Sequence, residues 1–265
     1  QELLALMADR RGGGTWLLRD LEARLPRHVP VASLERTLPG LAGNQLRLVW
    51  YAAILSELEV YAPRANVLAL DARDVVLQAD PIAALTAAAT RLSERWQLAF
   101  VGDCLTPALT DRYFKAWGPK CLPPSALAAL GQSPPVNGGV VLGKARALRR
   151  LYAKAAILAS AQPTACKEGA REQHVLTGAA YELRALHPRS VVVVPNNIGM
   201  QTAVFNMGVN NEYVYQRHLK LNERSGFVEG PAGQKIAILH QFERRNRAPV
   251  FEFLQRHATR TKAWS

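Results

Sequence analysis

The sequence predicts an α/β protein with a mixed, mainly parallel sheet that is flanked by helices. Short apolar runs, bounded by Gly, Pro, Asn or Asp, alternate along the chain with segments of helical periodicity. Several of these runs lead directly into polar residues, and open α/β sheets bind ligands at the carboxyl ends of their strands. We therefore expect the functional site at these strand ends. The 265 residues fit a single domain over residues 1–265.

The elements follow from hydrophobic periodicity, taken in chain order. Residues 1–25 are expected to form helical pieces that are broken at Gly12, Gly13 and Gly14, and residues 28–32 a short strand. Apolar residues at helical spacing predict helices over 44–59, 82–94, 144–160, 168–183 and 250–257. Apolar runs predict strands over 67–70, 97–101, 139–142, 191–194 and 236–239. Residues 105–132 are expected to be irregular because they hold several prolines, and residues 137–138 to form a turn.

The charge of the chain indicates anionic partners. The net charge is +12, and basic residues cluster at 10–11, 149–150, 244–247 and 256–262. Such a surface attracts nucleotides, nucleic acid, anionic lipid or acidic glycans. Neither zinc-finger spacing nor an RNA-binding aromatic signature accompanies the basic residues, so we expect no nucleic-acid partner. A generally basic, solvated surface is the alternative explanation for most of them.

No membrane-spanning segment is expected, because the sequence lacks a stretch of about 18 consecutive apolar residues. A charged-then-apolar leader is not visible at the amino terminus either. The chain begins at Gln1 rather than Met, which leaves room for a leader or anchor upstream.

The three cysteines do not form a C-x-x-C pair, so a structural zinc site is not expected. Cys104 and Cys121 flank a loop-like segment and could form a disulfide in an oxidising compartment. Buried free thiols are the alternative.

The strongest chemical signal lies in residues 66–81. A buried strand is predicted to end at Leu70 and to be followed by Asp71 and Asp74, with Arg73 between them. Two carboxylates three residues apart at one strand end can share a divalent cation, and such oxygen ligands suit magnesium or manganese. The alternative is that Asp71 caps a turn and Asp74 pairs with Arg73.

Residues 138–145 are similar to a phosphate-binding P-loop but do not fit one. Ala145 stands where a hydroxyl should ligate magnesium, and the interior 140–142 is a strand pattern. We therefore expect no NTPase site, and the glycine fingerprint of dinucleotide-binding proteins follows none of the predicted strands.

Further polar groups follow at other predicted strand ends and helix starts: Asn-Gly-Gly at 137–139, Glu-Gln-His at 172–174, Pro-Asn-Asn at 195–197 and His-Gln-Phe at 240–242. This order resembles the nucleotide-sugar glycosyltransferases with the Rossmann-like GT-A fold. It is most similar to the branch whose acid motif is written Asp-x-Arg-Asp-Val-x-x-Gln-x-x-Pro. The matching residues here are Asp71, Arg73, Asp74, Val75, Gln78 and Pro81, and the resemblance runs over about residues 45–253.

The resemblance implies a metal-dependent glycosyltransferase. It would transfer a sugar from a nucleoside-diphosphate sugar, with uridine as the expected base, to a hydroxyl on a glycan, protein or lipid. Asp71, Asp74 and His240 would bind Mn²⁺ or Mg²⁺, which neutralises charge on the departing nucleoside diphosphate. His240 could instead be a core or surface histidine.

The resemblance also implies a donor site and a catalytic pair. The implied donor-binding residues are Arg47, Asp71, Arg73, Asn137, Gly138 and Gly139, and the implied catalytic residues are Glu172 and Gln173. Alternatively, Arg47 lies on a solvated helix face, Arg73 pairs with a carboxylate and Glu172 only starts a helix. The family usually has Asp where Glu172 stands. Inversion at the anomeric carbon would need a carboxylate base, for which the candidates are Asp103, Asp111 and Glu172.

Two functions from other classes stay open, and one part of the resemblance is weak. The rivals are a non-catalytic anion- or nucleic-acid-binding α/β protein and a nucleotidyltransferase, which also uses paired acids and a metal.

Residues 28–32 are a short candidate for the first strand of the GT-A fold, and a chain without that strand would be a fragment or a degenerate member. In a eukaryote, the resemblance implies the Golgi or another secretory lumen.

Overall fold

The computed structural model describes residues 7–8, 44–71, 75–103, 108, 112–161, 172–196, 204–206, 219–240 and 248–258. The elements predicted within residues 1–32 therefore lie outside the described residues, apart from Met7 and Ala8. So do the predicted site residues Arg73, Asp74 and Asp111, and the cysteines Cys104 and Cys166.

The main sheet has the strand order β1-β2-β5-β4-β6. Its strands are β1 (Met7–Ala8), β2 (Asn66–Leu70), β4 (Leu98–Gly102), β5 (Val136–Lys144) and β6 (Val191–Val194). β5 lies between β2 and β4 and runs antiparallel to both, whereas β4 and β6 are parallel. The mixed α/β class is thus confirmed. The expectation of a mainly parallel sheet is wrong, because β5 reverses direction between its two neighbours.

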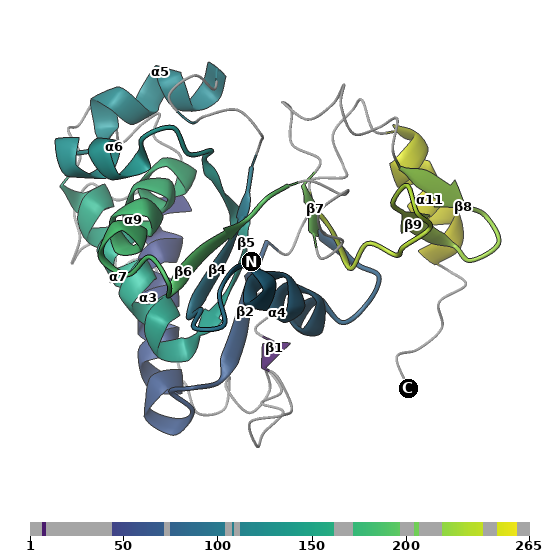
Figure 1. The fold of residues 1–265 in the computed structure, drawn as a ribbon, viewed down its shortest axis with the longest axis horizontal. Helices are drawn as coiled ribbons and strands as arrows, with labels where there is room; N and C mark the ends of the chain where they lie inside the picture. The colour runs from purple at the N-terminus through teal and green to yellow at the C-terminus, as the bar shows by residue number, and fades with distance from the viewer. Residues whose placement is uncertain are drawn as a thin grey trace.

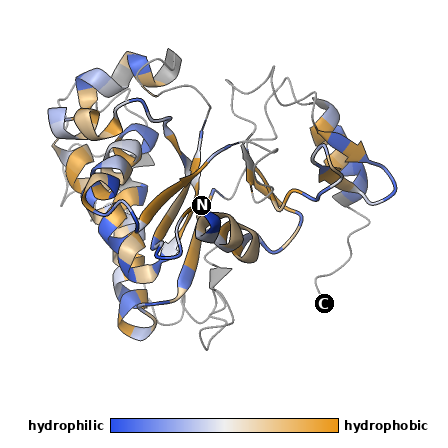
Figure 2. Ribbon diagram, viewed as in Figure 1, coloured by the Kyte–Doolittle hydropathy of each residue, from blue (hydrophilic) through white to orange (hydrophobic). Residues whose placement is uncertain are grey.

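Helices cover both faces of this sheet, as Figure 1 shows. One face is covered by α3 (Asn44–Tyr61), α7 (Ala145–Ser160) and α9 (Glu172–Leu186), and the other by α4 (Pro81–Leu92). Successive strand residues point to opposite faces. Val67 and Ala69 accordingly pack in the core beneath α3, α7 and α9, and Leu68 and Leu70 in the core beneath α4. The strands are therefore hydrophobic along their length (Figure 2).

Proline and its neighbours set several helix starts. α4 begins at Pro81, and the carboxylate of the preceding Asp80 accepts a hydrogen bond of 2.9 Å from the backbone N–H of Ala83. The expectation that residues 105–132 are irregular is wrong in part, because α5 (Arg112–Cys121) and α6 (Pro124–Leu130) lie there. Pro124 fits the first turn of α6, where its missing N–H costs nothing. Prolines here mark a helix start rather than its absence.

The predicted turn at residues 137–138 is also wrong. Both residues belong to β5, which starts at Val136 and pairs with β2 over residues 140–144 and with β4 at Val136 and over residues 141–143. The pairings before and after residues 137–138 keep the backbone extended despite the glycines. A strand over residues 138–144, rather than a flexible loop, agrees with the rejection of a P-loop.

A smaller sheet adjoins the end of β2. It has the order β3-β10-β7, from β3 (Val75–Leu77), β10 (Ile238–His240) and β7 (Val204–Asn206). Beyond it lie the hairpin β8 (Lys220–Asn222) and β9 (Phe227–Glu229), and α11 (Ala248–Ala258). None of the described helices is long and apolar enough to cross a membrane.

Gln78 ties the hairpin to the rest of the molecule. Its buried amide donates to the carbonyl oxygens of Val228 and Ile236, at 3.0 and 2.7 Å, and accepts from the N–H of Val228 at 2.7 Å. An amide is needed here because the position demands both a donor and an acceptor. The Gln and Pro of the acid motif therefore have structural roles in this chain, the Gln at the hairpin and Pro81 at the start of α4.

Candidate functional site

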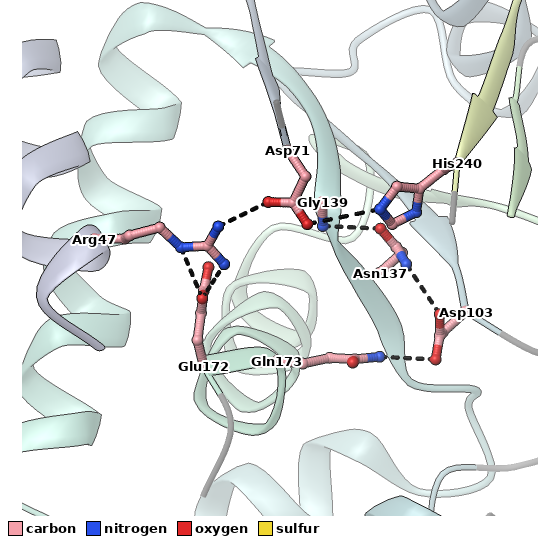
Figure 3. A network of polar contacts seen from close by, with 8 residues as sticks. All are labelled: Arg47, Asp71, Asp103, Asn137, Gly139, Glu172, Gln173 and His240. Atoms are coloured by element: carbon pink, nitrogen blue, oxygen red, sulfur yellow. Dashed lines mark hydrogen bonds and ion pairs between the residues drawn. The ribbon is translucent and has the colours of Figure 1, made fainter. Parts of the chain in front are cut away.

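The carboxyl ends of β2 and β4 meet the start of β5, the start of α9 and the end of β10, and polar side chains from all five elements gather there (Figure 3). Arg47 reaches the same place from α3. We call this group the strand-end cluster. Its members are Arg47, Asp71, Asp103, Asn137, Gly139, Glu172, Gln173 and His240.

Arg47 bridges two carboxylates. Its Nη1 donates to Asp71 Oδ1 at 2.8 Å, and its Nε to Glu172 Oε2 at 3.0 Å, with Nη2 contacting the same oxygen. The Arg47 side chain is 22% exposed and that of Glu172 only 5%. Arg47 is therefore not on a solvated helix face, and Glu172, although it does start α9, is also an ion-pair partner. The planar guanidinium suits such a fork of two carboxylates.

The charges of these three groups stabilise one another. Burial by itself would lower the pKa of Arg47, but the neighbouring Glu172 and Asp71 carboxylates outweigh it and raise that pKa. Burial would likewise raise the pKa of Asp71, yet the adjacent His240 and the charge of Arg47 hold it below its ordinary value. Asp71 is therefore a carboxylate and Arg47 a cation at neutral pH.

Asp71 and His240 face one another beside Gly139. Asp71 Oδ2 lies 3.6 Å from His240 Nε2, and the backbone N–H of Asp71 donates to the carbonyl of Gly139 at 2.9 Å. A Cβ at position 139 would lie 2.5 Å from Asp71 Oδ2 and would also collide with the His240 ring. Only glycine leaves room for both side chains at this point of β5.

Asp103 organises the amide side of the cluster. Its two carboxylate oxygens accept hydrogen bonds from Asn137 Nδ2 at 3.0 Å and from Gln173 Nε2 at 2.8 Å. The Oδ1 of Asn137 accepts from the N–H of Gly139 at 2.8 Å, and the buried Asn196 Nδ2 donates to the carbonyl of Asp103 at 3.4 Å. These bonds fix the start of α9 against the start of β5. Both base candidates among the described residues, Asp103 and Glu172, are thus engaged by donors.

Gly138 lies apart from the acids. A Cβ there would meet Leu176 of α9 at 3.6 Å, an ordinary van der Waals contact. Of the two predicted donor-site glycines, only Gly139 adjoins Asp71 and His240.

The described residues supply two of the three predicted metal ligands. Asp71 and His240 lie next to each other, whereas Asp74 is outside the described residues. Among the described residues, no group of three or more His, Cys, Asp or Glu side chains is placed to hold a metal ion. A carboxylate oxygen and an imidazole nitrogen are both acceptable to manganese, and Mg²⁺ and Mn²⁺ sites commonly take further oxygens from water or substrate phosphates. The pair therefore fits one side of such an ion.

Tyr152 of α7 was not predicted as part of the site, although it is buried close to the cluster. Its ring packs edge-on against that of Tyr51 at 4.7 Å between centroids, and its hydroxyl has no hydrogen-bond partner among the described residues. Burial raises the pKa of this hydroxyl, and the Glu172 carboxylate adds to the effect. The helical spacing of Leu148, Tyr152 and Ala155 indicates a core position only, so no sequence signal separates Tyr152 from ordinary core residues.

Cys121, at the end of α5, is in a disulfide. The alternative of a buried free thiol is therefore wrong for this residue. Cys104 and Cys166 are both outside the described residues.

Comparison with known proteins leaves the strand-end cluster to be interpreted from its own chemistry. The resemblance carried by the acid motif stays an interpretation of the residues, and the GT-A type of the fold stays a prediction. No protein-family model, no curated protein and no solved structure matches the chain.

Proposed function

We propose that this chain is a metal-dependent glycosyltransferase that moves a sugar from a nucleoside-diphosphate sugar to a hydroxyl acceptor on a glycan, protein or lipid. The observation that carries the proposal is the approach of Asp71 and His240 to 3.6 Å at the end of β2, beside a glycine that makes room for both. These residues come from distant parts of the sequence, and both belong to the expected metal ligands.

The proposed Mn²⁺ or Mg²⁺ would act as a Lewis acid on the diphosphate of the donor, where negative charge builds as the nucleoside diphosphate departs. Asp71 and His240 would hold it, together with Asp74. Arg47 binds Oδ1 of Asp71, which turns Oδ2 toward His240 and keeps the carboxylate ionised. Arg47 is thus a positioning residue for Asp71 in this proposal, rather than a direct contact of the diphosphate.

The amide side of the cluster would face the donor sugar. Asn137 and Gln173 both donate to Asp103, so their amide groups are fixed in orientation before any substrate arrives. Preorganised amides and carboxylates are suitable partners for sugar hydroxyls. Glu172 and Gln173 at the start of α9 are the proposed catalytic pair, and Glu172 is held in place by its pairing with Arg47.

The disulfide of Cys121 supports an oxidising compartment such as a secretory lumen, because disulfides are rare in reducing cytosol.

The proposal is tested with a panel of nucleotide-sugars and Mn²⁺, scored by donor hydrolysis and by calorimetric Mn²⁺ binding. We expect Asp71→Asn and Asp74→Ala to lower turnover by about 100-fold or more, since each removes a ligand of the ion. Glu94→Gln, at an exposed carboxylate that precedes β4 and so lies at the opposite end of that strand from the cluster, is the control and should keep turnover. If the intact protein neither binds nor hydrolyses any nucleotide-sugar with metal, the glycosyltransferase proposal fails.

The net charge of +12 favours one second candidate, a non-catalytic anion-binding protein. That function would show as binding of polyanions that survives chelation of divalent metal and weakens steeply with salt.

A further inference from the structure

A pocket lies at the end of the main sheet opposite to the strand-end cluster, where β4 and β6 begin. It is a pocket of about 200 Å³ between these strand starts, the first half of α7 and the end of α9. We call it the basic pocket. Its lining comprises Gln97 and Leu98 beside β4, Ser190 and Val191 beside β6, Arg146, Ala147 and Arg150 of α7, and Leu183 and His187 at the end of α9.

The lining divides into apolar and cationic parts. Leu98 and Val191 are buried and, with Ala147 and Leu183, supply the apolar surface. Arg146 and Arg150 are exposed residues one helical turn apart, and His187 is exposed across from them. None of the described residues of the lining carries a carboxylate. The pocket therefore joins an apolar surface to the guanidinium groups of Arg146 and Arg150 and the imidazole of His187.

The cations of the basic pocket are only partly neutralised by the protein itself. Arg146 pairs with Glu59 at 3.3 Å, but the same carboxylate also binds Arg149. Arg150 forms no ion pair within the part of the chain that the structure describes. Glu59 thus serves two arginines, and Arg150 has no counter-charge among the described residues.

The start of α7 makes this excess of positive charge unfavourable. Its first turn holds no acidic residue, while Lys144 is its N-cap residue and Arg146, Arg149 and Arg150 lie within its first two turns. Helix amino termini are stabilised by negative charge, and like charges four residues apart repel one another. A bound anion would relieve both effects at once.

We propose that the basic pocket binds a phosphomonoester that carries a small apolar group. Guanidinium groups bind phosphate oxygens in a bidentate manner, and Arg146 and Arg150 are spaced to share one phosphate. A dry cavity of about 150 Å³ accepts one benzene ring, so a pocket of about 200 Å³ suits a ring-sized body whose phosphate lies at the rim. This site is separate from the strand-end cluster, because the two lie at opposite ends of β4.

The test is a calorimetric titration of the intact protein with phenyl phosphate, inorganic phosphate and phenol, with EDTA present to keep divalent metal out of the strand-end cluster. We expect saturable 1:1 binding of phenyl phosphate, about tenfold tighter than either inorganic phosphate or phenol, since each of these lacks half of the ligand. The ring-proton NMR signals of His187, assigned with His187→Gln, should shift during the titration.

Variants locate the binding. Arg150→Glu should weaken phenyl phosphate at least about tenfold, and Arg150→Lys should weaken it less because the charge remains. Arg224→Glu makes the same charge change on the distant β8–β9 hairpin and should leave affinity within about twofold. Arg150 has no ion pair to lose among the described residues, so Arg150→Glu should fold, which a circular dichroism melt verifies.

Three results would overturn the proposal: no saturable binding of phenyl phosphate to the intact protein, equal weakening by Arg150→Glu and Arg224→Glu, or binding that leaves the His187 signals unmoved. Equal affinity for inorganic phosphate would exclude the apolar group from the ligand, and equal affinity for phenol would exclude the phosphate. None of these results depends on glycosyltransferase activity.

Discussion

Arginine side chains lie in opposite environments at the two ends of the main sheet. At the carboxyl ends of β2 and β4, Arg47 is largely buried between Asp71 and Glu172. At the amino ends of β4 and β6, Arg150 is exposed and forms no ion pair among the described residues. In the strand-end cluster the arginine is neutralised by carboxylates, whereas the basic pocket keeps an excess of positive charge.

Helix direction explains part of this contrast. α9 begins at the strand-end cluster with Glu172, an acid at the positive end of the helix dipole, which is the favourable arrangement. α7 begins at the other end of the sheet with bases, which is the unfavourable one. The same electrostatic rule therefore predicts that the protein's own acid stabilises the start of α9, whereas a bound anion would stabilise the start of α7.

The largest difference in stability is expected between the variants that remove the arginine at one end of the sheet or at the other. Arg47→Ala leaves Asp71 and the buried Glu172 with their counter-charge removed, which should lower the free energy of unfolding by about 3–5 kcal/mol. Arg150→Ala should change it by no more than about 0.5 kcal/mol, because an exposed side chain without an ion pair is lost. Urea unfolding of both variants measures the difference. Similar values for the two would mean that the ends do not differ in this way.

The next largest difference in stability is expected between alanine substitutions at two adjacent glycines of β5, Gly139 and Gly138. In Gly139→Ala the new Cβ would press on Asp71 Oδ2 and the His240 ring, whereas in Gly138→Ala it would make ordinary contacts with Leu176 at 3.6 Å and with the Cα of Gln173 at 4.0 Å. We expect Gly139→Ala to cost about 1–3 kcal/mol of stability and to weaken Mn²⁺ binding, since it overpacks the cluster. Gly138→Ala should stay within about 0.5 kcal/mol of the natural chain. An unchanged Mn²⁺ affinity in a folded Gly139→Ala would argue against the metal site.

The last prediction concerns how the contribution of Asp71 to the free energy of unfolding depends on pH. The folded-state pKa of Asp71 lies below its unfolded-state value, so its carboxylate stabilises the fold above about pH 4 and loses that contribution as the pH falls through the folded-state pKa. Asp71→Asn should lower the free energy of unfolding by about 1–3 kcal/mol at pH 7. The gap from the natural chain should narrow below about pH 4. A gap independent of pH would show that the charge of Asp71 does not stabilise the fold.

The strongest sequence signals gave most of the framework. Helical spacing placed α3, α4, α7, α9 and α11, and apolar runs placed β2, β4, β6 and β10, within a few residues. Weaker signals failed. The prolines around α6 suggested irregular chain, and Asn137 and Gly138 suggested a turn, because local propensity says nothing of the strands that pair on either side of β5.

What the sequence by itself determined is which polar residues follow the buried strands: Asp71 follows β2 and Asp103 follows β4, since the apolar runs stop just before them. Only the tertiary structure decided which of them meet. Arg47 pairs with residues 24 and 125 positions away, and β5 runs against its neighbours. Periodicity reports which face of an element is buried but carries no direction and no partner, so pairings across such distances follow only from the packed fold.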